Sequence, residues 1–533
     1  MSCACVRFRT SERCRHTRAY RFEIQVLFCP VLLQQDQDGF CSFGTCQTEA
    51  VDPAEEPVVF SVACPKPTAW PAILGCMGGF LILAFLRLGL AAWLPLTPDE
   101  AYYWWWSQHL QAGYLDHPPM VALWIRLGTL LCGSTPLGIR LCGVLASFLA
   151  SLALWRAGQI WLRVGPGAQA AWLLNATLMF GLGMCLMTPD TPQMFFAALL
   201  LWCLAEILRR ESTYSVWWWG GAGLCLGGGM ESKYTFLLLA VGLGGYVLQS
   251  GQWRRVGPWL AAGIAGVSCG PTLWWNALHR WAGFLKQGRR LGHWAPAHAL
   301  HYLGELLAGQ IGLLTPVVGF CVVLGCWQAR RKMPLLLWLV LPGAGVFLAH
   351  ALYAGRVQAN WPCVLYPALA MAGALPGRFF RTAVATGLFM GLIVSVQALF
   401  HCLPLNAHHD PALRLMAGWD GLARQAETEA RAAGAEALVI EDYGLAAIIS
   451  FYARQHPQAL PVVGTDPRWG YLTGLRKVTV RQAAELSEAR GALKIGGRHL
   501  IRRVLLYSQK RQGDVRDYVL ASCGNTLGWQ ISP

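Results

Sequence analysis

Long apolar runs separated by short polar segments dominate the chain from residue 71 to residue 403. Each run is long enough for a helix to cross the ~30 Å hydrocarbon core of a bilayer, which takes roughly 20 residues. The pattern predicts eleven membrane-spanning helices, at residues 71–95, 136–163, 167–187, 191–208, 215–230, 234–250, 256–275, 304–328, 333–352, 361–377 and 381–403. We therefore expect a polytopic α-helical membrane protein with its transmembrane domain at residues 71–403.

The segment after the last apolar run has a different pattern. "GWDGLARQAETEARAAGA" predicts a helix, "EALVIED" a strand, "YGLAAIISFYARQ" a second helix and "RHLIRRVLLYS" a second strand. We therefore expect residues 404–533 to form a small α/β domain. Because Cys523 is its one cysteine, the domain has no internal disulfide framework.

The segment before the first apolar run, residues 1–70, shows neither helical nor strand periodicity. It contains seven of the 19 cysteines, without the paired spacing of a zinc site. We interpret it as an extension without regular structure, or as the result of a start codon assigned too far upstream. A metal site built from these cysteines is the alternative, and no cleavable signal peptide is evident.

Composition agrees with a membrane location. The chain is 55% hydrophobic and only 13% charged, with a mean hydropathy of +0.39, whereas soluble domains are roughly a quarter charged. The net charge of +15 does not indicate a nucleic-acid partner, because basic residues in a membrane protein mark topology: Lys and Arg are retained on the cytoplasmic side.

Basic residues fall at alternate turns of the predicted helices. If the first helix runs outward, every inner turn is basic, with Arg163, Arg209 and Arg210, Arg254 and Arg255, Arg330 to Lys332, and Arg378 with Arg381. We therefore expect an inner-membrane protein whose C-terminal domain lies in the periplasm.

Acidic residues are concentrated on the predicted outer side. Six of the eight carboxylates between residues 71 and 403 fall there. The stretch "PDEAYYWWWSQHLQAGYLDHPPM" places Asp99 and Glu100 just past the first spanning helix. We expect "AYYWWWSQHL" to form a short helix in the membrane interface, with most of its rings in an aromatic belt. The sequence thus predicts an outward-facing polar site.

The same stretch adds Tyr102, Asp116 and His117 to this site. Other predicted outer segments add further polar and charged side chains, which are Asp190, Glu231, Lys233, Lys286, Arg289, Arg290 and His293. Arg and Lys can hold a lipid phosphate and stabilise it as a leaving group, while a carboxylate takes the proton of an incoming hydroxyl. This combination suits sugar transfer from a polyprenyl phosphate, although each carboxylate alone is equally well explained as a helix cap or an ion-pair partner.

The chain has no internal repeat of fixed period, Walker-type loop, paired zinc spacing or nucleophile elbow. The glycine-rich "GLCLGGGM" at residues 223–230 lies inside an apolar run. It therefore predicts close helix packing rather than a phosphate-binding loop.

Four segments resemble the membrane glycosyltransferases of the GT-C superfamily, in the family 39 branch of protein O-mannosyltransferases and bacterial aminoarabinose transferases. They are "TPDEAYYWWWSQHLQAGYLDHPPMVA", "TPDTPQMFF", "ESKYTFLLL" and "QANWPCVLYPAL", in the expected order. The resemblance covers about residues 71 to 460. It implies a GT-C fold and a cell-envelope enzyme that takes a sugar from a lipid phosphate on the non-cytoplasmic face, usually with inversion.

The resemblance also implies roles for individual residues. Asp99 matches the first-loop acidic residue and is the expected general base, with Glu100 beside it, and Asp190 matches the second acidic position. His117 stands where the aminoarabinose enzymes have a Lys that contacts the donor phosphate. A neutral His carries no fixed charge. This difference puts the aminoarabinose substrate in doubt and leaves the charge to Lys233, Arg289 or Arg290.

Some assignments stay open at this level. Arg356, Asn360 and Trp361 match an outer-loop segment where a substrate contact and helix packing are both plausible. No cofactor is certain, and the acids are compatible with Mg²⁺ or Mn²⁺, without a set of six ligands in the spacing. The acceptor is a lipid, a glycan or a protein. The alternatives to an enzyme are a transporter or flippase of lipid-linked sugars, which would bury charge near the bilayer midplane, and a non-catalytic cell-envelope assembly protein.

Overall fold

The computed structural model describes residues 4–10, 22–28, 70–162, 167–209, 215–289, 296–353, 355–405, 410–455, 459–488, 499–507 and 514–531. The chain divides into two compact units, Met1–Gly79 and Phe80–Pro533, which are described separately.

The N-terminal unit contains strands β1 (Ala4–Thr10) and β2 (Phe22–Phe28), which pair antiparallel. The sequence was expected to form no strand here, and this expectation is wrong. In β1 the apolar Val6 and Phe8 alternate with Arg7 and Arg9, which is the period-two pattern of a strand. Most of residues 1–69, and with them the alternative cysteine metal site, lie outside the described residues.

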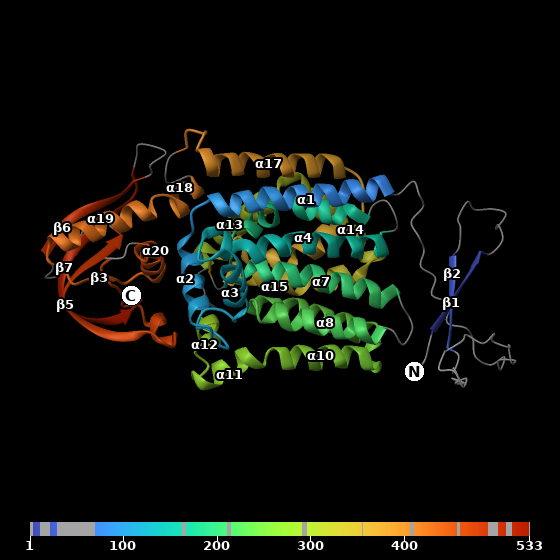
Figure 1. The fold of residues 1–533 in the computed structure, drawn as a ribbon. Coiled ribbons are helices and arrows are strands. Elements are labelled where there is room, and N and C mark those ends of the chain that lie inside the picture. Colours follow the sequence, from blue (N-terminus) through green and yellow to red (C-terminus); the bar gives the residue numbers. More distant parts are fainter. Residues whose placement is uncertain are drawn as a thin grey trace, which may run out of the picture. The chain divides into compact units, whose positions relative to one another are not determined.

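The larger unit begins with a helical region. Its elements are α1 (Trp70–Trp93, shared with the first unit), α2 (Pro98–Gln108), α3 (Met120–Cys132), α4 (Pro136–Trp161), α5 (Gly167–Asn175), α6 (Leu178–Gly181), η2 (Gly183–Cys185), α7 (Asp190–Arg209), α8 (Ser215–Met230), η3 (Tyr234–Phe236), α9 (Leu237–Gln249), η4 (Gln252–Arg254), α10 (Val256–Ser268), α11 (Gly270–Leu278), α12 (Ala282–Arg289), α13 (Pro296–Leu314), α14 (Pro316–Lys332), α15 (Pro334–Tyr353), η5 (Trp361–Leu365), α16 (Tyr366–Gly373) and α17 (Phe380–Phe400). Helices α4, α7, α8 and α10 pack successively side by side (Figure 1).

The helices confirm a multi-pass membrane protein. Among the described residues, five helices are long and apolar enough to cross a membrane, and seven spans result if each of two bent pairs counts as one. The other predicted spans, at 215–230, 234–250, 256–275 and 361–377, correspond to shorter helices. Length and apolarity of the helices therefore support fewer spans than the eleven apolar runs suggest.

One predicted span is wrong in its boundaries. The range 304–328 combines the end of α13 with the start of α14, and these two helices meet at an angle of 102°. Thr315 between them has φ +69°, and Pro316 cannot donate the backbone hydrogen bond that would continue α13. The apolar run is therefore divided between two helices.

Close packing of α8 against α10 confirms the prediction for "GLCLGGGM". A Cβ atom on Gly223 would lie 2.7 Å from the carbonyl oxygen of Ala261, and one on Gly227 would lie 2.3 Å from the Cβ of Ser268. Both distances are too short for any side chain. The glycines therefore allow the two helix backbones to approach closely.

The C-terminal domain is a small α/β domain, as predicted. It contains α18 (Pro411–Met416), α19 (Trp419–Ala432), β3 (Ala437–Ile440), α20 (Tyr443–Ala453), β4 (Val462–Gly464), η6 (Pro467–Tyr471), β5 (Arg476–Glu488), β6 (His499–Tyr507) and β7 (Asp514–Gln530). The sheet order is β4-β3-β5-β7-β6, with β3 parallel to β4 and β5, and β7 antiparallel to β5 and β6. The sequence patterns predict α19, β3, α20 and β6, but not β4, β5 or β7.

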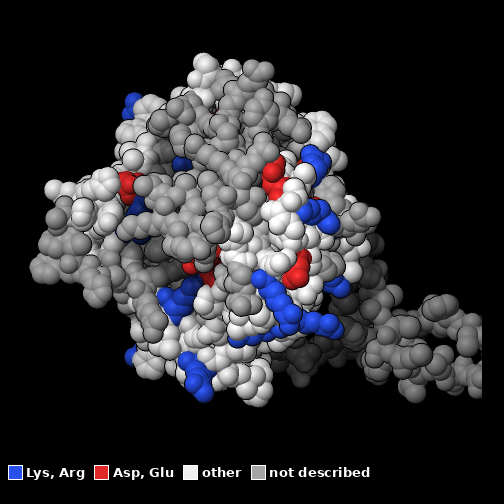
Figure 2. Space-filling model, turned by 90° about the vertical axis from the view of Figure 1, so that its left-hand side faces the viewer, with Lys and Arg blue, Asp and Glu red and all other residues white. Residues whose placement is uncertain are grey.

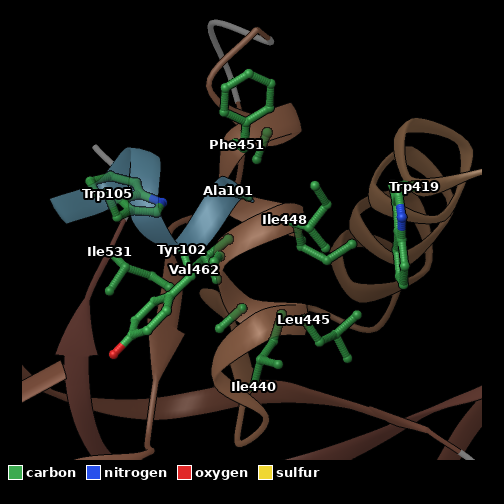
Figure 3. Packing of buried hydrophobic residues seen from close by; sticks show 14 of the residues in the cluster. Ala101, Tyr102, Trp105, Trp419, Ile440, Leu445, Ile448, Phe451, Val462 and Ile531 are labelled. Carbon is green, nitrogen blue, oxygen red and sulfur yellow. The ribbon is translucent and has the colours of Figure 1, made fainter. Parts of the chain in front are cut away.

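The aromatic run of α2 joins this domain to the helical region. All five rings from Tyr102 to Trp106 are at most 9% exposed and share one hydrophobic core with the C-terminal domain. Figure 3 shows Tyr102 and Trp105 in one cluster with Phe451, Ile448 and Val462 of that domain. The predicted aromatic belt at the membrane surface is therefore wrong, because protein rather than lipid surrounds these rings.

Candidate functional site

Helix α2 begins with a capping box that places two acids in its first turn. The hydroxyl of Thr97 accepts the backbone N–H of Glu100, and the carboxylate of Glu100 accepts the backbone N–H of Thr97. Pro98 occupies the first turn, where its missing N–H costs nothing. Asp99 and Glu100 thus start the same turn but point into different surroundings.

Glu100 is fully buried and held by cationic and backbone donors. Arg140 of α4 donates from Nε to Oε1 and from Nη2 to Oε2, both at 2.6 Å, and the backbone N–H of Met187 donates to Oε1 at 3.0 Å. Arg140 is 0% exposed as well. This carboxylate therefore connects α2 to α4 and to the segment before α7, and we expect it to support the fold.

Asp99 lies in contrasting surroundings. The residue is exposed, and its Oδ1 accepts a hydrogen bond of 3.2 Å from the hydroxyl of Tyr443 in the C-terminal domain. Among the described residues, no cation forms an ion pair with it. The surrounding protein displaces water from Asp99 and thereby raises its pKa. The hydrogen bond from Tyr443 lowers the pKa, whereas the nearby carboxylates, Asp116 foremost, raise it.

Asp116 follows in the same loop and is fixed by α12. Its Oδ1 lies 2.6 Å from Lys286 Nζ, its Oδ2 accepts the hydroxyl of Tyr102 at 3.1 Å, and its carbonyl accepts Gln287 Nε2 at 2.7 Å. Burial acts to raise the pKa of Asp116, but the charge and the hydrogen bond of Lys286 outweigh it, so the pKa is lowered. Asp116 is therefore a paired carboxylate.

Asp190 brings three distant segments together at the start of α7. Lys233 Nζ lies 2.6 Å from Oδ1, Asn360 Nδ2 donates to Oδ2 at 2.7 Å, and Cys363 Sγ donates to Oδ1 at 3.1 Å. Asp190 and Lys233 are both buried. The sequence motifs that contain these residues therefore converge, as an assembled site requires.

The remaining predicted residues are less closely connected. His117 is partly buried, with its ring 6.2 Å from that of Tyr103. Arg356 is exposed and pairs with Glu305 at 2.8 Å. The side chain of Arg289, and all of Arg290, lie outside the described residues.

Two residues of the site come from the C-terminal domain and escaped the sequence analysis. Besides Tyr443, Arg468 places its guanidinium 3.8 Å from the centre of the Tyr443 ring and lies 3.6 Å from Asp466. No sequence motif marks either residue. Figure 2, which views the end of the molecule where this domain lies, shows acidic and basic side chains close together on one face.

A metal site is not evident among the described residues, where no three His, Cys, Asp or Glu side chains are grouped closely enough to hold an ion. The involvement of Mg²⁺ or Mn²⁺ stays a prediction.

Comparison with known proteins finds similar glycosyltransferases. Residues 116–275 match the family of dolichyl-phosphate-mannose-protein mannosyltransferases. The lipid A galacturonosyltransferase RgtD of Rhizobium johnstonii (strain DSM 114642 / LMG 32736 / 3841) is 26% identical over 383 residues, which are 67% of this chain and 77% of that protein. These matches support a membrane glycosyltransferase that is similar to both. The resemblance to membrane glycosyltransferases that the sequence motifs carry is thereby confirmed.

The fold of the glycosyltransferase is that of ArnT from Cupriavidus metallidurans. The apo crystal structure of ArnT aligns with a TM-score of 0.57 at 16% identity and covers 85% of this chain and 98% of ArnT. The structure of ArnT bound to undecaprenyl phosphate aligns with a TM-score of 0.55 at 17% identity, over 86% and 98% of the two chains. This likeness confirms the predicted GT-C fold.

Proposed function

We propose that the glycosyltransferase moves a sugar from a polyprenyl phosphate to a hydroxyl of a lipid acceptor at the periplasmic face of the inner membrane, with Asp99 as general base. The observation that carries this proposal is the difference between Asp99 and three acids of the site, Glu100, Asp116 and Asp190. Glu100, Asp116 and Asp190 each lie 2.6 Å from a cationic side chain. Asp99 has none among the described residues.

The chemistry of a general base favours the unpaired acid. A cation at hydrogen-bond distance stabilises a carboxylate and makes it a weaker proton acceptor. Asp99, whose pKa is raised, is a stronger base, and it is exposed to an acceptor arriving from water.

The transfer step follows from this placement. The acceptor oxygen bonds to the anomeric carbon of the sugar while the bond from that carbon to the phosphate oxygen breaks. The acceptor proton moves to Asp99, and the polyprenyl phosphate leaves with the bonding electrons. Cations near the outer acids, Lys286 and Lys233 among them, stabilise the negative charge on the leaving phosphate.

The other residues of the site have supporting roles in this proposal. Tyr102 and Lys286 hold Asp116, and Asn360 and Lys233 hold Asp190, so that the two carboxylates orient substrate hydroxyls. Arg289 and Arg290 follow directly in the chain and are proposed to bind the donor phosphate. His117 and Arg356 are proposed as weaker contacts to the sugar or headgroup.

The proposed donor and acceptor are supported by the relatives. ArnT, which has the same fold, has been crystallised with undecaprenyl phosphate, and RgtD is a lipid A galacturonosyltransferase. We infer lipid A, or a lipid of similar headgroup chemistry, as the acceptor class.

The direct test is transfer by the purified enzyme in nanodiscs. Polyprenyl phosphates labelled in the sugar, with galacturonic acid and mannose as two donors, are incubated with lipid A. We expect label in lipid A with one of the donors. Label that crosses the bilayer while still attached to the polyprenyl phosphate would instead indicate a transporter. Transfer to a protein or polysaccharide fraction alone would refute the acceptor class.

A further inference from the structure

The C-terminal domain reaches the proposed base through the first residue of helix α20. Asp442 caps this helix by accepting the backbone N–H of Leu445 at 2.7 Å. Tyr443 follows, and its hydroxyl donates to Oδ1 of Asp99 at 3.2 Å. The chain thus brings two residues 344 positions apart into direct contact.

The ring of Tyr443 is held by side chains from both parts of the protein. Tyr102 of α2 meets it edge-on, with ring centres 4.8 Å apart. Arg468 of the C-terminal domain lies 3.8 Å from its centre. Trp469, which is fully buried, meets Tyr102 with ring centres 5.5 Å apart. These contacts hold the Tyr443 ring, and Arg468 also interacts with the Tyr443 hydroxyl.

Further contacts fix the domain against α2. Trp105 Nε1 donates to Ser450 Oγ at 2.8 Å, and Arg454 donates to the carbonyl oxygen of Ser134. Arg454 also lies 4.8 Å from the centre of the Trp104 ring. Because α20 supplies Tyr443 and Ser450, and Arg454 caps its C-terminal end, the docking of α20 on α2 determines where the Tyr443 hydroxyl lies.

We propose that the C-terminal domain is part of the catalytic site, with Tyr443 as the positioning residue that orients the carboxylate of Asp99 toward the acceptor hydroxyl. This inference rests on the proposed function, in which Asp99 is the base. The bond from Tyr443 occupies Oδ1 and leaves Oδ2, which accepts no hydrogen bond from the described residues, to take the proton. The domain therefore acts in turnover as well as in folding.

Replacement of Tyr443 by Phe tests this inference, because it removes the hydroxyl and keeps the ring that contacts Tyr102 and Arg468. A donated hydrogen bond stabilises the ionised carboxylate, so its loss raises the pKa of Asp99 further. We expect the acid limb of the kcat profile to move to higher pH by about one unit, with the largest loss of turnover at acid pH. The donor KM should change little.

Tyr452→Phe is the matched control. It removes a hydroxyl from the same helix, but the Tyr452 hydroxyl faces the backbone of Leu96 and not Asp99. Its pH profile should equal that of the wild type. Thermal unfolding and donor binding, measured on each preparation, show that the variants are folded.

Asp99→Asn, assayed in parallel, separates the inference from the proposed function. If Asp99→Asn is inactive and Tyr443→Phe has a wild-type pH profile, Tyr443 only packs the domain, and the inference alone is wrong. If Asp99→Asn keeps its turnover, both the base assignment and the role of Tyr443 are wrong. A shifted acid limb in Tyr443→Phe together with an inactive Asp99→Asn supports both.

Discussion

Replacing Glu100 by Gln separates a structural role for this carboxylate from a catalytic one. The substitution keeps the size of the side chain but removes the charge that faces Arg140 at two contacts of 2.6 Å. It also replaces one acceptor oxygen by an NH₂ group, which would face a donor, either Arg140 Nη2 or the backbone N–H of Met187. The guanidinium would then remain buried without a counter-charge.

The expected cost follows from the geometry of this pair. Removal of one partner from a buried ion pair costs about 3–5 kcal/mol. Arg140 keeps hydrogen bonds to the carbonyl oxygens of Ala91, Leu94 and Pro95, which partly compensate the lost charge. We therefore expect Glu100→Gln to lower the free energy of unfolding by about 3 kcal/mol, at the low end of this range.

Unfolding by heat or by denaturant, carried out in detergent, measures this loss. Single-turnover transfer is measured at a temperature at which the wild type and the variant are both folded. Glu427→Gln is the matched control, because Glu427 forms a more exposed pair with Arg431 at 3.0 Å on α19. Its cost should be below about 1 kcal/mol. Unchanged stability together with lost turnover in Glu100→Gln would refute the structural role and return Glu100 to the catalytic residues.

Three further predictions test other parts of the account. Lys286→Gln should raise the donor KM and the pKa of Asp116, because the cation 2.6 Å from Asp116 is lost. Lys332→Gln, at the end of α14, is the control. Equal KM values in the two variants would exclude Lys286 from donor binding. Burial raises the pKa of Glu231 to about 7 from its ordinary 4.5, so the folded state binds the proton more tightly and loses stability as the pH rises from 4.5 through 7. Glu231→Gln should abolish that loss in thermal unfolding between pH 5 and 8, and an unchanged pH dependence would contradict it. A reporter active only in the periplasm should be active when fused after Pro533, and a cytoplasmic signal would reverse the proposed topology.

The sequence was sufficient for the parts of the site that depend on local order. Asp99, Glu100 and Asp116 lie in one motif, and the capping position of Glu100 follows from Thr97 three residues earlier. The predicted topology placed Asp190 and Lys233 on the same outer side, whereas Asn360 was implied only by the resemblance to known glycosyltransferases. The sequence did not reveal which acids form ion pairs, because the pairing depends on distances across the helical region that only the folded structure gives.

The errors have physical causes as well. A run of Tyr and Trp is equally suited to the membrane interface and to a domain interface, so the pattern of α2 did not reveal that its rings bind the C-terminal domain. Tyr443 and Arg468 lie more than 300 residues beyond Asp99 in the chain and carry no motif. By contrast, the break between α13 and α14 had a local signal, since Pro316 interrupts the apolar run that was predicted as one span.

The central claim, that Asp99 takes the proton of the acceptor, is tested most directly by single-turnover transfer with Asp99→Asn. The enzyme is reconstituted in nanodiscs with saturating donor lipid, and donor binding is measured on the same preparation. General-base catalysis contributes typically 10²–10⁴-fold, so we predict a fall of about that size in the transfer rate with donor binding retained. Near-normal transfer by Asp99→Asn would contradict the account and leave Asp99 as a surface acid at the start of α2.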